Sequence, residues 1–224
     1  GITANPTVGA FSDLLIRQGG STILTEVPEM FGAERMLMQR CVTKEVFDKT
    51  VKLVNGFKEY FLRHGEAVSD NPSPGNREGG ITTLEDKSCG CIQKGGTAPV
   101  VDVLDYGDPV HTNGLNLLYG PGNDLVSSTA LAASGAHMVI FTTGRGTPFG
   151  CPAPTIKVSS NAELVQHKKN WIDFDASILL RGATLAEAGQ ALYQKVLSVA
   201  SGEKTSTERT GFRQIAIFKD GVTL

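Results

Sequence analysis

The chain has 224 residues, of which 40% are hydrophobic and 20% are charged, and this is typical of one large globular domain with a substantial core. A formal net charge of −2 provides no broad positive field, so we expect neither a nucleic-acid-binding protein nor attachment to an anionic membrane. No segment approaches the ~18 apolar residues of a transmembrane helix, and no leading stretch resembles a signal peptide. With only four unevenly spaced cysteines the chain has no disulfide framework, and we expect a cytoplasmic protein.

In the first half of the chain, hydrophobic periodicity predicts helices separated by one buried strand. Residues 8–18 have the pattern of a short amphipathic helix, which Gly19 and Gly20 end, and residues 21–25 are typical of a buried strand. Further helices are predicted over residues 32–41, 44–64 and 84–89, with a loop over residues 70–80.

The second half alternates between strands and helices. Strands are predicted at residues 100–104, 115–119, 137–142, 155–158 and 215–218, and helices at residues 125–134, 161–169 and 185–200. The polar residues 201–210 are the candidate flexible link, so residues 201–224 are expected to form a polar tail plus a last strand.

This alternation predicts one α/β domain over residues 1–224, with a mostly parallel sheet between two helical layers, a Rossmann-like variant. In such sheets, ligands bind beyond the carboxyl ends of the strands. Glu26 and Glu29 follow the first predicted strand, the turn 120–124 follows the third, and Arg145 follows the fourth. We therefore expect these groups to share one edge of the sheet.

The run of residues 69–80 contains two prolines and three glycines but no large apolar side chain. Prolines stiffen a backbone and glycines let it approach a ligand closely, so this loop can present hydrogen-bonding side chains. Such groups suit a hydroxyl-rich ligand that bears a carboxylate. The alternative is an ordinary solvated crossover loop.

The sequence also resembles a known family. The words SDNPSPGNREGGITTLEDKS, GLNLLYGPGND, TTGRGTP, NWIDFDAS and FRQIAIFKDGVTL, in this order, are similar to the carboxy-terminal domain of the galactarate/altronate dehydratase family. The resemblance covers essentially the whole chain. It implies a hydro-lyase that dehydrates a sugar acid and depends on a divalent metal ion, usually Fe²⁺. It also implies that the chain is the carboxy-terminal piece of a longer dehydratase, which we expect to form a homodimer.

Within the family, the sequences of the segments ITTLEDKS and IAIFKDGVTL favour galactarate as the substrate and 5-dehydro-4-deoxyglucarate as the product. Altronate dehydration, or the reaction of the related sulfolactate sulfo-lyases, is the alternative enzyme activity. A further alternative is that the isolated domain only binds a sugar acid or assembles subunits.

A dehydratase of this kind needs positive charge beside the substrate carboxylate, and acidic residues are the candidate ligands for the implied metal. Glu26 and Glu29 flank Pro28, and carboxylate oxygens suit Fe²⁺ or Mg²⁺. Glu29 can instead simply favour the amino terminus of a helix, and so can Glu85. Cys89 is a candidate iron contact, with a small buried hydrophobe as the alternative.

Two loops are candidates for holding a substrate carboxylate. The turn 120–124 opens a helix whose free N–H groups attract anions, although Asn123 or Asp124 can simply be the helix cap. Arg145 stands between two glycines after a core strand, where a guanidinium can clamp a carboxylate. The P-loop and GxGxxG patterns are absent, which disfavours a nucleotide. Lys87 and Lys94 are possible bases if buried, and the sequence assigns neither a role.

Three sets of candidate residues follow from these patterns. The predicted catalytic residues are Glu26, Glu29, Asp70 and Arg145. The predicted substrate-binding residues are Asn71, Asn76, Arg77, Asn123, Asp124, Gly144, Gly146 and Thr147. The predicted metal ligands are Glu26, Glu29, Glu85 and Cys89.

Overall fold

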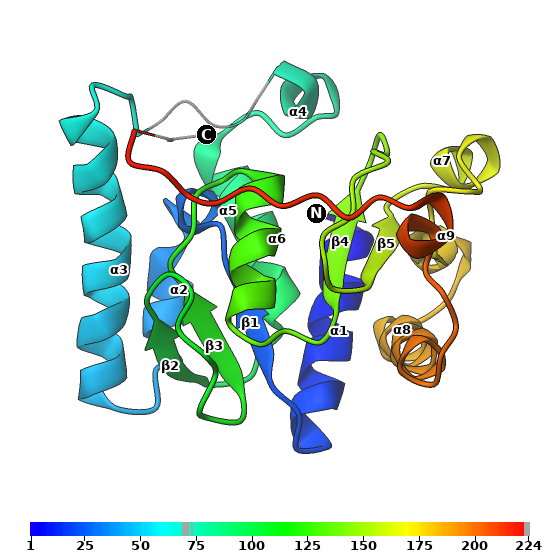
Figure 1. Cartoon of the computed structure of the whole chain (residues 1–224), viewed down its shortest axis with the longest axis horizontal. Coiled ribbons are helices and arrows are strands. Elements are labelled where there is room, and N and C mark those ends of the chain that lie inside the picture. The colour runs from blue at the N-terminus through cyan, green and yellow to red at the C-terminus, as the bar shows by residue number, and fades with distance from the viewer. Residues whose placement is uncertain (69–71, 73, 222–224) are drawn as a thin grey trace.

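The computed structural model describes residues 1–68, 72 and 74–221. Within these residues the strands form two parallel sheets of three strands each (Figure 1). The first sheet has the order β1-β3-β2, and its strands are β1 (Thr22–Leu24), β2 (Val100–Leu104) and β3 (Leu115–Leu118). The second has the order β4-β5-β6, with β4 (Val139–Thr143), β5 (Thr155–Ser159) and β6 (Phe174–Asp175). The predicted α/β class with parallel strands is confirmed.

The expected single sheet is split between β1 and β4. Ile23 and Leu24 of β1, the following Thr25, and Val139 to Thr142 of β4 line one cavity of about 120 Å³. The two strands therefore face each other across a cavity instead of forming a hydrogen-bonded ladder.

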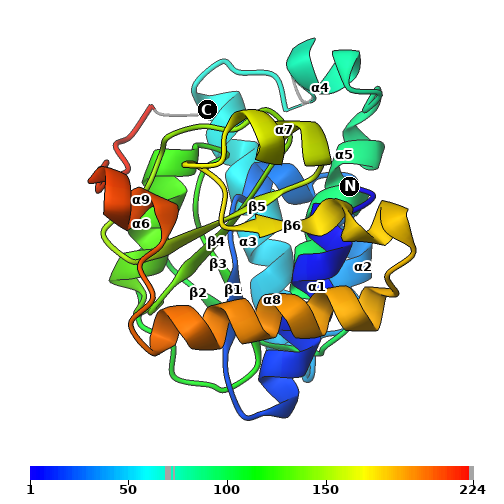
Figure 2. The same cartoon turned by 90° about the vertical axis from the view of Figure 1, so that its right-hand side faces the viewer.

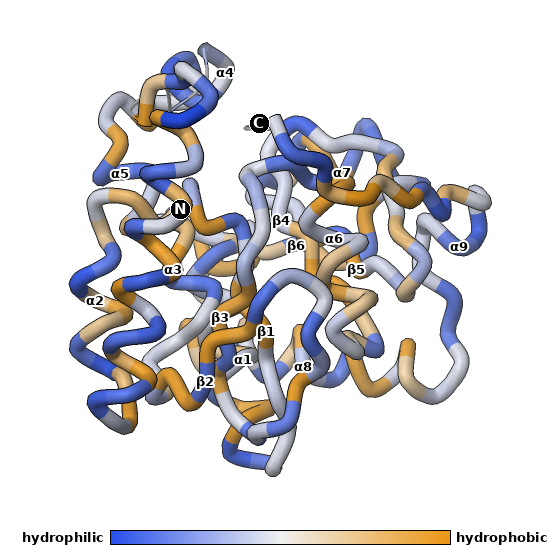
Figure 3. The backbone as a smooth tube through the Cα atoms, turned by 60° about the vertical axis from the view of Figure 1, so that its left-hand side comes forward, coloured by the Kyte–Doolittle hydropathy of each residue, from blue (hydrophilic) through white to orange (hydrophobic). Residues whose placement is uncertain are grey.

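Helices cover both faces of the first sheet. Leu118 packs with Leu104 and with Ala130 of α6 (Asp124–Ala133), whereas Leu117 packs on the other face with Phe57 of α3 (Lys44–Arg63). Neighbouring strand residues point to opposite faces, which explains this division. The first three strands are hydrophobic along most of their length (Figure 3), as expected for a sheet between two layers.

The second sheet rests on two crossing helices. Side chains of α1 (Ala4–Arg17) and α8 (Leu185–Ala200) pack against Ile156 and Val158 of β5. Figure 2 shows α8 lying across α1. A Cβ atom at Gly189 would lie 2.7 Å from that of Ala10, so glycine lets the helices approach this closely.

The remaining short helices of the first half lie near the carboxyl ends of the first sheet or beside it. They are η1 (Val27–Met30), α2 (Glu34–Met38), α4 (Pro74–Glu78), α5 (Leu84–Ile92) and η2 (Gln93–Gly95). The prediction of a loop over residues 70–80 is thus wrong at α4, because Pro74 suits the first turn of a helix. Asp70 and Asn71 lie outside the described residues.

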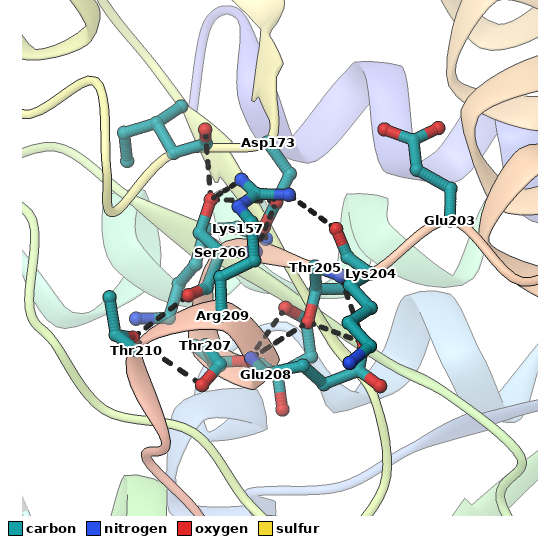
Figure 4. A network of polar contacts seen from close by, with 12 residues as sticks. Lys157, Asp173, Glu203, Lys204, Thr205, Ser206, Thr207, Glu208, Arg209 and Thr210 are labelled. Carbon is teal, nitrogen blue, oxygen red and sulfur yellow. Dashed lines mark hydrogen bonds and ion pairs between the residues drawn. The ribbon is translucent and has the colours of Figure 1, made fainter.

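The prediction of a flexible link at residues 201–210 is also wrong. This segment contains α9 (Ser206–Thr210), which Thr205 caps and which packs on β5. The backbone N and the hydroxyl of Ser206 both donate to Asp173 Oδ1, at 2.7 and 2.8 Å (Figure 4). These partly buried hydrogen bonds fix the segment in spite of its polar composition. The other elements of this half are α7 (Ala162–His167) and η3 (Ala176–Arg181).

Residues 215–218 do not form the predicted strand. The backbone N–H of Ala216 donates to the Thr129 hydroxyl at 3.1 Å, and that of Phe218 donates to the Tyr106 hydroxyl at 3.0 Å. Because these partners are side chains and not strand carbonyls, the segment is an extended strap. Figure 1 shows it crossing in front of α6 towards α3. None of the described helices is both long and apolar enough to cross a membrane.

Candidate active site

The carboxyl end of β1 leads directly into a strained acidic residue. Glu26 has φ of 64°, and it is the one non-glycine residue with positive φ in the described part of the chain. This left-handed conformation costs energy for a residue with a Cβ atom, and such strain clusters at functional sites. The Glu26 side chain is only 21% exposed and lines the cavity between β1 and β4.

Helix α5 presents a lysine and a thiol to the second acidic residue. Lys87 Nζ lies 2.7 Å from Glu29 Oε1, and Cys91 Sγ donates to Glu29 Oε2 at 2.9 Å. Residues four apart lie on one face of a helix, so α5 directs both groups towards Glu29. The Glu29 carboxylate, 13% exposed, is held from two sides.

Lys94 and Asp124 complete the arrangement. Lys94 Nζ of η2 lies 3.8 Å from Glu26 Oε2, and Asp124, the first residue of α6, lines the same cavity as Glu26 and Lys94. We call these groups the carboxylate–lysine cluster, which comprises Glu26, Glu29, Lys87, Cys91, Lys94 and Asp124. Of the groups that were expected to share one edge of the sheet, Glu26 and Asp124 border this cavity together with Thr142 of β4, whereas Glu29 and Arg145 do not line it.

Burial dominates the protonation behaviour of the cluster. It raises the pKa of Glu26 to about 7; the negative charges of Glu29 and Asp124 add to this, and Lys94 opposes it. Burial also raises the pKa of Asp124, and it raises the pKa of the Cys91 thiol to about 12. At neutral pH Cys91 is therefore a neutral thiol, and its S–H group donates a hydrogen bond to Glu29.

Lys94 behaves differently from a buried catalytic amine. Burial alone would lower its pKa, but the surrounding Cys91, Glu26 and Glu29 raise the pKa above its ordinary value. Lys94 thus remains an ammonium ion at neutral pH, and it acts as a fixed positive charge.

The comparison with known proteins now identifies the family. A family model described as D-galactarate/Altronate dehydratase, C-terminal, matches residues 1–223. The chain belongs to this family.

Among individual relatives of this dehydratase family, an altronate dehydratase of Escherichia coli (strain K12) is 55% identical over 224 residues, which is 100% of this chain and 45% of that protein. An altronate dehydratase of Bacillus subtilis (strain 168) is 57% identical over 225 residues, again 100% of this chain and 45% of the relative. A galactarate dehydratase (L-threo-forming) of Escherichia coli (strain K12) is 37% identical over 97% of this chain and 42% of that protein. The chain thus spans less than half the length of these relatives. The comparison supports the altronate alternative better than the galactarate prediction.

The metal ligands expected from the resemblance do not come together as one set. Glu85 is exposed in the first turn of α5, and Cys89 packs against the hydrophobic core cluster that includes Phe31 and Leu37. Among the residues that the structure describes, no three histidine, cysteine, aspartate or glutamate side chains form a group that could hold a metal ion. The described residues therefore do not fit a complete metal site. Two of the four, Glu26 and Glu29, lie in the cluster beside lysines.

Arg145 lies apart from the cluster contacts. Its Nη2 atom is 2.5 Å from Glu78 Oε2 of α4, and both side chains are largely exposed. Of the neighbouring predicted residues, Asn76 is half-buried in α4, and Arg77 is exposed and donates from Nε to the Pro72 carbonyl at 3.2 Å.

The other predicted substrate-binding residues have backbone or capping contacts. Asn123 caps α6, and its Oδ1 accepts from Val126 N at 3.2 Å. The Gly144 carbonyl accepts from Asn161 Nδ2, Gly146 N donates to Thr143 Oγ1, and the Thr147 carbonyl accepts from Lys157 Nζ. These contacts hold the loop after β4 in place.

The sequence alone assigned no role to two residues of the cluster, Lys87 and Lys94. It also indicated Cys89 as the candidate thiol, whereas Cys91 is the cysteine that contacts Glu29. Positions 87, 91 and 94 are separated by four and three residues. This spacing places side chains on one helical face, and it is the signal that could have grouped them.

Proposed function

We propose that the full-length protein dehydrates altronate, a sugar acid with a single carboxylate. The observation that carries this proposal is the 55% and 57% identity to altronate dehydratases over the whole chain, against 37% to a galactarate dehydratase. The cavity beside Glu26 and Lys94 is the proposed location of the reacting carbons.

Dehydration breaks two bonds in turn. A base takes the proton from the carbon beside the carboxylate, and hydroxide then leaves from the next carbon as the double bond forms; the enol that results tautomerises to a keto acid. The first step concentrates negative charge on the substrate carboxylate, so it needs a nearby cation.

Glu26 is the proposed base. A group with pKa near the working pH transfers protons efficiently in both directions, and burial brings the pKa of Glu26 to about 7. Its strained backbone fixes the carboxylate at the carboxyl end of β1, where it borders the cavity. A protonated Glu26 can subsequently supply a proton to the departing hydroxyl.

Lys94 is the proposed cation for the developing charge, because its raised pKa keeps it protonated beside the same cavity. Glu29 is a positioning residue in this scheme. Its contacts with Lys87 and Cys91 orient η1, and the negative charge of Glu29 helps to raise the pKa of Glu26.

The divalent metal ion, Fe²⁺, and the homodimer stay predictions from the resemblance, and the cytoplasmic location stays a prediction from the composition of the sequence. No step above passes through a metal. Elemental analysis of the full-length protein, purified anaerobically, tests the metal directly.

A substrate panel tests the proposed function. The full-length protein should convert altronate to a keto acid with a kcat/KM about 100-fold above that for galactarate, which corresponds to roughly 2.7 kcal/mol of discrimination. A preference for galactarate would replace this proposal with the galactarate alternative. Tight calorimetric binding of either acid without product would favour a binding domain. If the protein neither binds nor converts either acid, the proposed substrate class is rejected.

A further inference from the structure

Arg145 follows β4, a strand that borders the cavity of the proposed reaction site. Strand β4 contributes Phe141 and Thr142 to the cavity and ends at Thr143. Three residues of chain span at most roughly 10 Å, so the Arg145 backbone lies within that distance of Thr142. A guanidinium at this position can reach the end of a ligand whose other end lies in the cavity.

The loop that carries Arg145 is fixed on both sides. Gly146 N donates to Thr143 Oγ1 at 2.9 Å, and Asn161 Nδ2 donates to the Gly144 carbonyl at 2.9 Å. The backbone of this loop is therefore held while the Arg145 side chain, 72% exposed, projects from it. Such an arrangement is suited to presenting a cation.

The chain itself supplies a carboxylate to this cation. Glu78 Oε2 lies 2.5 Å from Arg145 Nη2, although the two residues are 67 positions apart. Gly75 of α4 also lies against the guanidinium; a Cβ atom there would lie 2.9 Å from Arg145 Nη1. An ion pair this exposed contributes only ~0–1 kcal/mol to stability, so folding alone gives little reason for it.

We infer that Glu78 occupies the place at Arg145 where the second carboxylate of a dicarboxylic sugar acid would bind, and that it thereby makes the site selective for monocarboxylic acids. A guanidinium binds a carboxylate through a planar pair of donors, and Glu78 already takes one of them. An incoming second carboxylate would have to displace Glu78 and then remain beside its negative charge. The terminal hydroxyl of an aldonate meets no such repulsion.

This inference rests on the proposed function, because it places the substrate between the cavity and Arg145. The decisive variant is Glu78→Gln, which keeps the size of the side chain and removes its charge. The matched control is Asp220→Asn. Asp220 also forms an exposed ion pair, because its Oδ1 atom lies 3.3 Å from Nη2 of Arg63, the last residue of α3.

The experiment measures kcat/KM and calorimetric Kd for altronate and for galactarate with the full-length protein. In Glu78→Gln the affinity for galactarate relative to altronate should rise roughly tenfold, because the substitution removes one charge repulsion. The substitution should change KM more than kcat. In the double variant Glu78→Gln/Arg145→Met the gain should disappear. Asp220→Asn should leave the ratio as in the wild type.

An unchanged ratio in Glu78→Gln, or an equal gain in the double variant, overturns the inference. A loss of binding for both acids with a lowered Tm also overturns it, because it would show that Glu78 is only structural. The proposed function is judged separately, from altronate turnover by the wild type. The Kd values need no turnover, so the selectivity of Glu78 is decided even if the wild type converts neither acid.

Discussion

Lys94 Nζ and Glu26 Oε2 lie 3.8 Å apart beside the cavity between the two sheets. The two groups differ in protonation behaviour. The lysine is surrounded by acidic groups and remains charged, whereas the glutamate is buried among other carboxylates and titrates near neutrality. A fixed cation beside a carboxylate that can gain and lose a proton is the arrangement that proton abstraction next to a substrate carboxylate requires.

Replacing Glu26 with glutamine should remove the proposed base. We expect kcat of the full-length protein for altronate to fall at least about 100-fold, the usual contribution of a general base, while Tm does not fall, because the substitution also removes a buried charge. The matched control is Glu59→Gln on α3, an exposed carboxylate outside the cluster, which should retain wild-type kcat. Equal kcat values for wild type and Glu26→Gln would exclude Glu26 as the base.

The raised pKa of Glu26 also predicts a pH dependence of stability. The pKa of Glu26 is about 7 in the folded protein, against an ordinary value of 4.5 that applies to the unfolded chain. At a pH between these two values, the folded state therefore binds more protons than the unfolded state. The contribution of Glu26 to the free energy of unfolding should therefore fall as pH rises from about 4.5 to about 7. Denaturant unfolding across this range should show that wild type loses stability relative to Glu26→Gln as pH rises, and parallel curves would contradict the assignment.

Lys157 predicts a change of the opposite sign at higher pH. Burial lowers its pKa from 10.5 to about 8, with Asp173 and Asp124 opposing the shift, and its side chain lies against the rings of Phe141 and Phe149. Between these pKa values the unfolded state binds more protons, so this residue should add stability as pH rises from about 8 to about 10.5.

The variant Lys157→Met, which keeps an unbranched side chain of similar length, isolates this effect. Denaturant titration gives the unfolding free energy of each protein. The value for wild type should rise relative to that for Lys157→Met as pH increases over that range. A difference that is constant with pH would show that Lys157 titrates normally in the folded protein.

The strap near the carboxyl terminus should contribute to stability through Phe218. This ring packs against Phe57, with centroids 6.3 Å apart, and against Tyr119 at 6.0 Å. Because Phe218 is only partly buried, Phe218→Ala should lower the free energy of unfolding by about 2 kcal/mol, below the range for a fully buried ring. Ile217→Ala is the control on the same strap, since Ile217 is 69% exposed and should change stability by less than about 0.5 kcal/mol. Equal effects of the two substitutions would mean that the strap does not anchor through Phe218.

The sequence by itself determined the secondary structure wherever the pattern was long and local. Helices α3 and α8 occur almost where their periodicity predicts, because apolar stripes and the caps Thr43 and Thr184 act within a few residues. The parallel strands and their shared carboxyl edge follow from strand–helix alternation, and this rule alone brought Glu26 and Asp124 together.

Only the tertiary structure decided which charges meet. The gap between β1 and β4, the burial of Lys94, the pairing of Arg145 with Glu78 and the anchoring of α9 by Asp173 all join residues distant in the chain. Local periodicity carries no information on such contacts, and the polar composition of residues 201–210 even predicted the wrong outcome. Burial and opposing charge set the pKa of each group, and both are properties of the packed molecule rather than of any segment.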